Sequence, residues 1–449
     1  MEKMKQIKSL IVIIFLCAST LLSAQSKLWS LEDCIQYAIE HNISIKQLII
    51  RKNSAEVDLN TSEMSRLPNL NAGGGQNWNF GRTQTQSGMY ENRSQSNTSF
   101  SIGTSIPLFT GFRIPNEIAR NKLEVEAAVQ NLEKAKEDLS LNIASLFLQV
   151  LFYKELLKVN QEQFALGQAQ IERTQALLDA GKVPPSQLYD IEAQVANDKV
   201  SVIQADNNLR LALLDLAQSL ELEQNGDFDI IIPEFGDVVT QNLSSVQPPQ
   251  IVFENAVKIK PAIKVQELQV QSAEKTLNIA KSGYLPTLNM SMGYGTNYFF
   301  LYNNSLPNRS LSDQLKNNAG QSIGLSLNIP IFNRFSVRNQ VRNAKFNIEN
   351  QQLALENVKK SLYKEIETAY LNALAAQEKY KASQQAIIST AESFKYAKER
   401  YEIGKSTVFE FNEARTRFIR SQSEEIQAKY DFIFRAKILD FYNGIPIKL

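Results

Sequence analysis

The chain has 449 residues, and its 48 Lys and Arg against 47 Asp and Glu give a net charge of +1. This balance argues against a general electrostatic attraction to nucleic acid. One histidine, His41, and two cysteines, Cys17 and Cys34, offer few means of building a metal site or a nucleophile–base pair. We therefore expect no catalytic, cofactor or metal site, and interpret His41 as a surface or helix C-capping residue beside Asn42.

The chain opens MEKMKQIKSLIVIIFLCASTLLSAQS, a basic start followed by an apolar run and small residues near Ala24. This is the pattern of a secretory signal peptide. We predict a signal peptide at 1–24 with cleavage after Ala24, although Leu22 is a poor residue at the third position before the cut. The mature chain is thus expected to leave the cytosol.

Cys17 has the position of a lipidation cysteine, but Leu16 before it is larger than the residue such sites prefer, so we do not expect lipidation. With Cys17 removed, Cys34 is the one remaining cysteine, so we expect no intramolecular disulfide. No later segment offers about 18 uninterrupted apolar residues, the length that a membrane-spanning helix needs.

The two halves of the chain repeat one plan, which should be recognised before local structure is assigned. A shift of 218 residues, as from Ala38 to Ala256, aligns their beginnings, and a shift of 223, as from Gly181 to Gly404, aligns the rest. We predict a first structural repeat at 25–222, a connection at 223–250 with room for one small strand, and a second repeat at 251–449.

Each repeat is predicted to run helix, strand, loop, strand, very long helix, turn, helix. The long helices are predicted at 116–180 and 339–403, each of 65 residues without proline. Gly167, in the first, is the one glycine that the two segments contain. Each would span roughly 100 Å at 1.5 Å per residue. Apolar residues at steps of three and four predict coiled-coil-like packing, and a second stripe beside the first indicates neighbours on two sides.

The remaining helices are about half as long. Return helices are predicted at 186–222 and 408–442, and leading helices at 31–66 and 253–282. Two such helices laid end to end would match one long partner. Breaks are expected in the leading helices at Ile43 and Pro261.

Four strands are predicted, at 69–80, 98–108, 287–299 and 321–331. Each alternates apolar side chains with Ser, Gly, Asn or Thr; in the second, Phe100 and Ile102 share one face. A length of about ten residues with a period of two is typical of a transmembrane β-barrel.

A half-buried soluble sheet has the same period. Three features favour the membrane: the small polar second face, the long polar loop at 81–97, and aromatic residues at both strand ends. The aromatic residues are Trp78, Phe80, Tyr298, Phe299, Phe300 and Tyr302 near the loops and Phe109, Phe112, Phe332 and Phe335 near the helices.

Four strands cannot close a barrel, and open sheet edges are not tolerated in lipid. The chain must therefore form oligomers. Two copies would supply eight strands, which only just close, whereas three copies would supply twelve and leave more room for a lumen. The sequence alone does not choose between these.

Several strings stand at matching places in this duplicated plan: SLEDCIQYAIEHNISIK, SIPLFTGFR and NIPIFNRFS, LLDAGKVPPSQLYDIEAQ, and RYEIGKSTVFEFNEAR. Through them the chain resembles the TolC outer-membrane efflux protein family over nearly all of its mature length. The resemblance implies a mainly α fold with a transmembrane β-barrel portion. It also implies a homotrimer whose 12-stranded barrel in the outer membrane continues into an α-helical barrel of 12 helices across the periplasm.

The same resemblance implies partners and site residues. A periplasmic adaptor protein and an inner-membrane pump of the RND or ABC type would dock at the closed far end. The adaptor-contacting tip would comprise the glycines that end the long helices and the lysines that follow them: Gly181, Lys182, Gly404 and Lys405.

Family members line the entrance with acidic residues six and nine positions after each glycine. These positions hold Gln187, Asp190, Glu410 and Glu413. In a threefold ring, Glu410 and Glu413 would favour cations. The alternative is a solvated helix face, in which Arg415 and Arg417 pair with them.

Tyr401 matches a tyrosine of the family's closing network. Two positions after Gly404, however, this chain has Ser406 where some members have arginine, which puts a tyrosine–arginine latch in doubt.

The leading functional hypothesis is a passive exit duct in the outer membrane, without catalysis and driven by its partners. The alternatives are a structural or adhesive coiled-coil surface protein and a secreted enzyme that uses paired carboxylates such as Glu410 and Glu413. The cargo, whether drug, metal ion or polypeptide, is not specified by the sequence.

Overall fold

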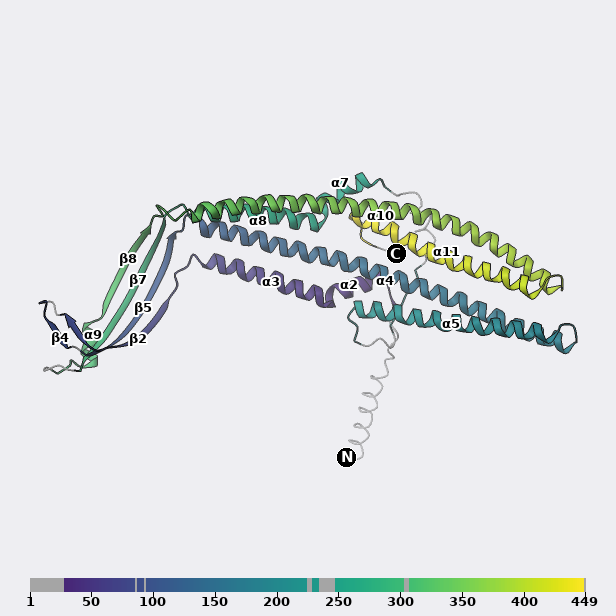
Figure 1. Ribbon diagram of the computed structural model, residues 1–449, viewed down its shortest axis with the longest axis horizontal. Coiled ribbons are helices and arrows are strands. Elements are labelled where there is room, and N and C mark those ends of the chain that lie inside the picture. The colour runs from purple at the N-terminus through teal and green to yellow at the C-terminus, as the bar shows by residue number, and fades with distance from the viewer. Residues whose placement is uncertain are drawn as a thin grey trace, which may run out of the picture. The chain divides into compact units, whose positions relative to one another are not determined.

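The structure, a computed structural model, describes residues 28–84, 87–92, 94–223, 228–233, 247–302 and 307–447 (Figure 1). The predicted signal peptide and Cys17 lie outside these residues. The chain divides into two compact units. We call them the hairpin unit (residues up to 49, 132–261 and from 359 onward) and the sheet unit (50–131 and 262–358).

The sheet unit contains one four-stranded antiparallel sheet in the order β2-β5-β7-β8. Its strands are β2 (Asn71–Asn79), β5 (Gln95–Phe109), β7 (Thr287–Leu301) and β8 (Gly320–Asn328). They occupy the ranges in which alternation predicts strands, although β5 begins earlier and β8 ends earlier than predicted. Strands β2 and β8 are the two edge strands of this sheet, and each pairs on one side only within the described chain.

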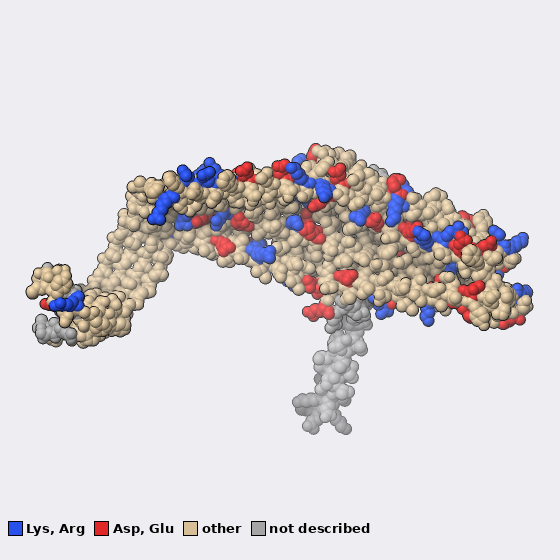
Figure 2. Space-filling view, in the orientation of Figure 1, with Lys and Arg blue, Asp and Glu red and all other residues tan. Residues whose placement is uncertain are grey.

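The apolar face of this sheet is uncovered. Phe100 is 50% exposed, Ile323 76% and Leu325 67%. A half-buried soluble sheet would cover such a face, so that alternative is wrong for the single chain. The opposite face bears a groove of about 620 Å³ lined mainly by Gly, Ser and Asn. None of the four strands contains a charged residue, and the sheet shows no charge in Figure 2.

Tight turns connect the sheet to α4 (Arg113–Asp179) and α10 (Ser336–Glu402), each of 67 residues. Phe112 and Phe335 precede these helices with φ of 66° and 62°, a conformation that is rare for bulky residues. Each ring packs edge-on against the phenylalanine three residues earlier, Phe109 or Phe332. The helices begin earlier than predicted; in the first, Pro115 lies in the first turn, where no N–H is needed.

The shorter helices are broken at the expected places. In the first repeat, α2 (Leu31–His41) ends before Asn42 and α3 (Ile43–Met64) begins directly after it. In the second, α7 (Pro249–Ile259) is followed by α8 (Pro261–Ser282), with the break at Lys260. The return helices are α5 (Pro185–Ser219) and α11 (Val408–Tyr442).

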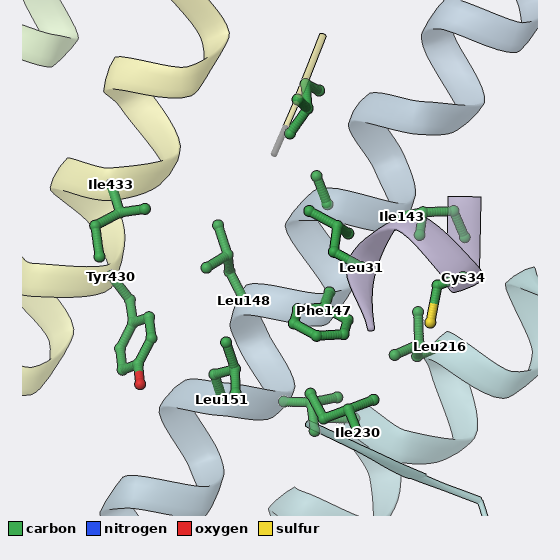
Figure 3. Close-up of a cluster of buried hydrophobic side chains, with 14 of the residues drawn as sticks. Leu31, Cys34, Ile143, Phe147, Leu148, Leu151, Leu216, Ile230, Tyr430 and Ile433 are labelled. Atoms are coloured by element: carbon green, nitrogen blue, oxygen red, sulfur yellow. The ribbon is translucent and has the colours of Figure 1, made fainter. Parts of the chain in front are cut away.

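The hairpin unit is held together by an apolar core between α2, α4, α5 and α11 (Figure 3). Phe147 of α4, Leu216 of α5 and Ile433 of α11 are at most 1% exposed. This core buries part of α4, the one described helix with a window long and apolar enough to cross a membrane; 33% of that window is buried. Burial of such side chains contributes about 1.5–3 kcal/mol each.

Some elements were not anticipated. The loop between β2 and β5 contains a hairpin of β3 (Arg82–Gln84) and β4 (Tyr90–Asn92), and the second loop contains α9 (Leu311–Asn317). The small strand expected in the connection is β6 (Asp229–Ile230); its parallel partner, β1 (Leu28–Trp29), was not predicted. His41, the last residue of α2, stacks on Tyr37 with ring centroids 3.9 Å apart.

Candidate functional site at the ends of the two hairpins

Helices α4 and α5 form one hairpin and α10 and α11 form the other, and both turn with the same backbone geometry. Gly181 and Gly404 have φ of 69° and 73°. The N–H of Lys182 donates to the carbonyl of Leu177 at 2.9 Å, and that of Lys405 to the carbonyl of Arg400 at 2.8 Å. With the glycine N–H groups bonded three residues back, each turn is a Schellman motif, for which glycine is the favoured residue.

The residues expected at the tip are accessible. Gly181, Lys182, Gly404 and Lys405 are all exposed. A Cβ atom added to either glycine would meet nothing within 4 Å. The two glycines are therefore favoured by the backbone conformation, and the surface around them is exposed in the single chain.

Glu410 completes a capping box at the start of α11. Its carboxylate accepts hydrogen bonds from the Ser406 hydroxyl at 2.6 Å and the Thr407 N–H at 3.1 Å. Its own N–H donates to Thr407 Oγ1 at 3.2 Å. The hydrogen bond from Ser406, followed by that from Thr407, lowers the pKa of Glu410, so the carboxylate is ionised at neutral pH.

The other predicted entrance residues do not share one environment. Glu413 is exposed and lies 3.6 Å from Arg417 in an i, i+4 pair, one of the pairings considered from the sequence. Asp190 is exposed. Gln187 is half-buried, and its Oε1 accepts no hydrogen bond within the described residues. The single chain therefore shows which helix face each of these residues occupies, and it does not bring them together into one site.

Tyr401 belongs to an aromatic cluster near the end of the second hairpin. Its ring stacks on Phe411 with centroids 5.0 Å apart, and Phe394 packs against both Phe411 and Phe418. Tyr401 also contacts a small apolar cluster that contains Ile191. The position expected to join a closing network is thus packed into the hairpin unit.

The strongest polar contact of this region was missed. Arg415, considered from the sequence as an alternative partner of Glu410 or Glu413, is 3% exposed and pairs instead with Asp198 of α5, Nη2 to Oδ2, at 2.6 Å. It also donates to the carbonyl of Gln163 of α4 at 2.7 Å and to its Oε1 at 3.2 Å. We call Arg415, Asp198 and Gln163 the three-helix tie.

Gly167 makes room for this tie. A Cβ at Gly167 would lie 2.7 Å from Val195 Cγ2 and 3.2 Å from Asp198 Oδ2, so α4 and α5 approach here more closely than a larger residue allows. The only glycine between the ends of either long helix was the sequence signal for this close approach.

A cavity of about 530 Å³ lies elsewhere in the hairpin unit, among α2, α4, Lys260 and the end of α11. Lys260 is 5% exposed and its burial lowers its pKa. Its Nζ is 3.2 Å from Glu137 and 3.4 Å from the centroid of the Phe441 ring. Within the described residues, no group of three or more His, Cys, Asp or Glu could hold a metal ion.

The duplicated chain matches a known family twice. A family profile described as "Outer membrane efflux protein" covers residues 34–221 and 252–437. The outer membrane protein TolC of Escherichia coli (strain K12) is 23% identical over 422 residues, covering 92% of this chain and 82% of the relative.

Solved structures show the same fold. CusC, described in crystal structures of folding and transmembrane channel formation, aligns with a TM-score of 0.77 and 16% identity over 93% of this chain and 92% of its own. The CmeC outer membrane channel of Campylobacter jejuni aligns with a TM-score of 0.74 and 17% identity, over 93% and 86% of the two chains.

The chain belongs to the outer membrane efflux protein family, since the profile covers most of it. It is an outer-membrane exit channel of the efflux or type I secretion class that extends into the periplasm. The predicted fold class, duplication and location are confirmed. The family consists of channel proteins and not of enzymes, and the adhesive coiled-coil alternative is set aside.

Proposed function

We propose that three copies of the chain form one continuous duct: a 12-stranded barrel in the outer membrane and a tube of helices in the periplasm. The observation that carries this proposal is the sheet of the single chain. Its apolar face is uncovered, and β2 and β8 each have one edge unpaired by the described chain. Lipid would cover the face, and β8 of one copy would pair with β2 of the next.

Exposed apolar side chains on the helices support the same assembly. In the sheet unit, Ile50, Val57 and Met64 repeat every seven residues along α3 and are 66%, 62% and 49% exposed. On α10, Phe346 and Leu353 have the same spacing and are 60% and 61% exposed. A repeat of seven residues is typical of a coiled-coil seam. We therefore assign α10 of one copy to pack against α3 of its neighbour.

The hairpin unit carries a comparable pair of surfaces. On α5, Val200 and Ile203 are 51% and 59% exposed. On α10, Ile388 and Tyr396 are 60% and 61% exposed. We assign both surfaces to the seam between neighbouring copies.

The hairpin ends are the proposed docking surface for a periplasmic adaptor, which would connect the duct to an inner-membrane pump of the RND or ABC type. Gly181, Lys182, Gly404 and Lys405 would make this contact. The duct itself would conduct passively, without catalytic activity or a cofactor, because the pump supplies the energy. The first and second repeats each span one strand pair and one hairpin in this scheme.

At the entrance, Glu410 and Glu413 of three copies would form two rings of negative charge, with Asp190 and Gln187 contributed by the first repeat and Tyr401 packed behind them. The lowered pKa of Glu410 keeps its carboxylate charged. Rings of carboxylates attract cations at a pore mouth.

The assembly is tested by measuring the mass of the detergent-solubilised protein, which we expect to be three times that of the chain. A folded monomer that stays soluble without detergent would refute the duct. For the rings, Glu410→Ala with Glu413→Ala should lower cation preference in planar bilayers. Glu424→Ala removes an exposed charge from the same helix and is the matched control; unchanged selectivity in the double variant would rule out the rings.

A further inference from the structure

The cavity of about 530 Å³ in the hairpin unit is lined by four segments of one chain. They are helix α2, the part of α4 around Glu137, Lys260 in the break between α7 and α8, and residues at and after the end of α11. We call it the α2 cavity. All of its lining residues belong to the hairpin unit. Its volume falls within the range of about 300–1,000 Å³ that is typical of pockets for small molecules.

A glycine turn at the end of α11 forms one wall of the α2 cavity. Gly444 has φ of 84°, and its N–H donates to the carbonyl of Phe441 at 3.1 Å. The N–H of Ile445 donates to the carbonyl of Asp440 at 2.9 Å. This is the Schellman pattern that also ends the two long helices. Helix α11 therefore ends at Tyr442, and residues 445–447 line the cavity outside the helix.

The lining of the α2 cavity is mainly apolar. Ile445 and Pro446 are exposed to solvent. Covering such side chains with a ligand removes apolar surface from water, which is favourable. The cavity therefore suits a ligand with an apolar body. Its apolar side chains come from α2, the end of α11 and the residues that follow: Ile35, Ile39, Phe441, Ile445, Pro446 and Ile447.

Carboxylates outnumber ammonium groups among the charged residues of this lining. Four glutamates and two lysines give a formal net charge of −2. Lys136 lies 2.7 Å from Glu133, and Lys260 lies 3.2 Å from Glu137. Each lysine of the lining is therefore paired with a glutamate of the lining, and the excess charge is negative.

Lys260 is poorly placed to bind an anion. Its side chain is 6% exposed, and its Nζ lies 3.4 Å from the centroid of the Phe441 ring as well as 3.2 Å from Glu137. An anionic ligand would have to displace the Glu137 carboxylate from this buried ammonium group, which costs free energy. A cationic ligand would leave the pair intact.

Two glutamates of α2 remain beyond these pairs. Glu32 and Glu40 are exposed, and they lie about two helical turns apart, roughly 12 Å along the axis. Gln36 stands between them and donates to Glu40 Oε1 at 3.2 Å. Ile35 and Ile39 line the cavity from the same stretch of helix. Helix α2 thus offers the cavity apolar side chains with a carboxylate toward each end.

We propose that the α2 cavity binds an organic cation with an apolar body, whose charge is balanced by Glu32 and Glu40. The apolar lining fits the body of such a ligand, and the excess of carboxylates fits its charge. A small metal ion does not fit, because no group of three or more His, Cys, Asp or Glu in the described residues could hold one. The site lies within one chain, so this inference does not depend on the trimeric duct.

Equilibrium dialysis of the full-length protein in a non-ionic detergent, with detergent alone as the blank, tests this inference. The probes are tetraphenylphosphonium and tetraphenylborate, which have the same shape and opposite charges. We expect one phosphonium ion to bind per chain, about tenfold or more tightly than the borate, because the nearby carboxylates attract one and repel the other. Raising the salt from about 0.1 M to about 1 M should weaken phosphonium binding, since it screens these charges.

Variants locate the site. Glu32→Gln with Glu40→Gln should weaken phosphonium binding about tenfold, and it spares the capping box of α2, which uses Ser30 and Asp33. The matched control, Glu192→Gln with Glu424→Gln, neutralises two exposed glutamates outside the cavity and should leave the affinity within about twofold. The unfolding temperature of each ligand-free variant shows whether it remains folded.

The two probes need no variant, so the parent protein alone can refute the inference. Equal affinities for the phosphonium and the borate, or no saturable phosphonium binding above the detergent blank, would overturn it. Phosphonium binding that the Glu32 and Glu40 variant leaves unchanged would show that the cation binds elsewhere, and this too would overturn the site.

Discussion

The two hairpins show which parts of a duplicated structure are kept and which diverge. Their turns are equivalent: Gly181 and Gly404 have nearly the same φ and the same pattern of hydrogen bonds. The helices that follow differ. Thr407 caps α11 through its side chain, whereas Pro184 begins α5 without a side-chain hydrogen bond. Backbone geometry is therefore retained, while the side chains that begin the return helices have changed.

The difference is greatest at the three-helix tie. The position that corresponds to Arg415 in the first repeat is Glu192, which is exposed. The counterparts of Asp198 and Gln163 in the second repeat are Ser421 and Ala386. The described chain therefore contains one such tie. In it, an arginine of the second repeat contacts residues of the first repeat, and the equivalent residues in the reverse arrangement do not form a tie.

The largest expected effect of this asymmetry is on stability. Arg415→Met should destabilise the folded protein by about 3–5 kcal/mol, because Asp198 would remain as an unpaired buried charge. The matched variant Glu192→Met changes an exposed residue and should stay within about 0.5 kcal/mol. Thermal unfolding of the purified oligomer compares the two, and equal losses would contradict the assigned role of Arg415.

A double variant sharpens this comparison. Arg415→Met with Asp198→Leu removes both charges and should recover most of the stability lost in Arg415→Met, since apolar residues often replace a buried ion pair without loss. No recovery would show that the arginine stabilises the hairpins through contacts other than this pair.

The turns should respond equally, in contrast to the tie. Gly181→Ala and Gly404→Ala should each cost about 1–2 kcal/mol, the penalty for placing an L-residue in the left-handed region, because neither added Cβ meets another atom within 4 Å. Gly444→Ala, at φ 84°, should cost a similar amount, since its Cβ would lie 2.6 Å from Ile259 Cδ1, the end of an exposed side chain that can turn aside. Unequal effects of the first two variants on the unfolding temperature would show that the turns are not equivalent.

The sequence predicted features that depend on neighbouring residues. Alternation located all four long strands, and the glycine turns followed from the end of an apolar helix pattern. The breaks before Ile43 and Pro261 could be anticipated from proline and from the aligned position in the other repeat. These properties arise within one segment of the chain, so they can be read without knowing which segments meet.

The three-helix tie could not be predicted in this way. Gln163, Asp198 and Arg415 lie on three helices that are distant in the sequence. From the sequence, Arg415 was considered a partner of the nearby Glu410 or Glu413, whereas Glu413 pairs with Arg417, one turn along the same helix. The choice depends on which face of α11 is buried, and that is fixed by packing against the other hairpin.

The smallest predicted effect concerns the start of the two return helices. Thr407→Ala should cost about 1 kcal/mol, the usual loss for an N-cap hydroxyl, whereas Pro184→Ala removes no side-chain cap.

The contribution of Glu410 should also depend on pH. Its pKa is lowered in the folded protein, so its stabilising effect is complete above pH 4.5, the ordinary value for this side chain, and is lost as the pH falls through the lower, folded value. The difference in unfolding temperature between the parent protein and Glu410→Ala should therefore be constant near neutral pH and shrink in acid. A difference that persists unchanged in acid would mean that the carboxylate's charge does not stabilise the cap.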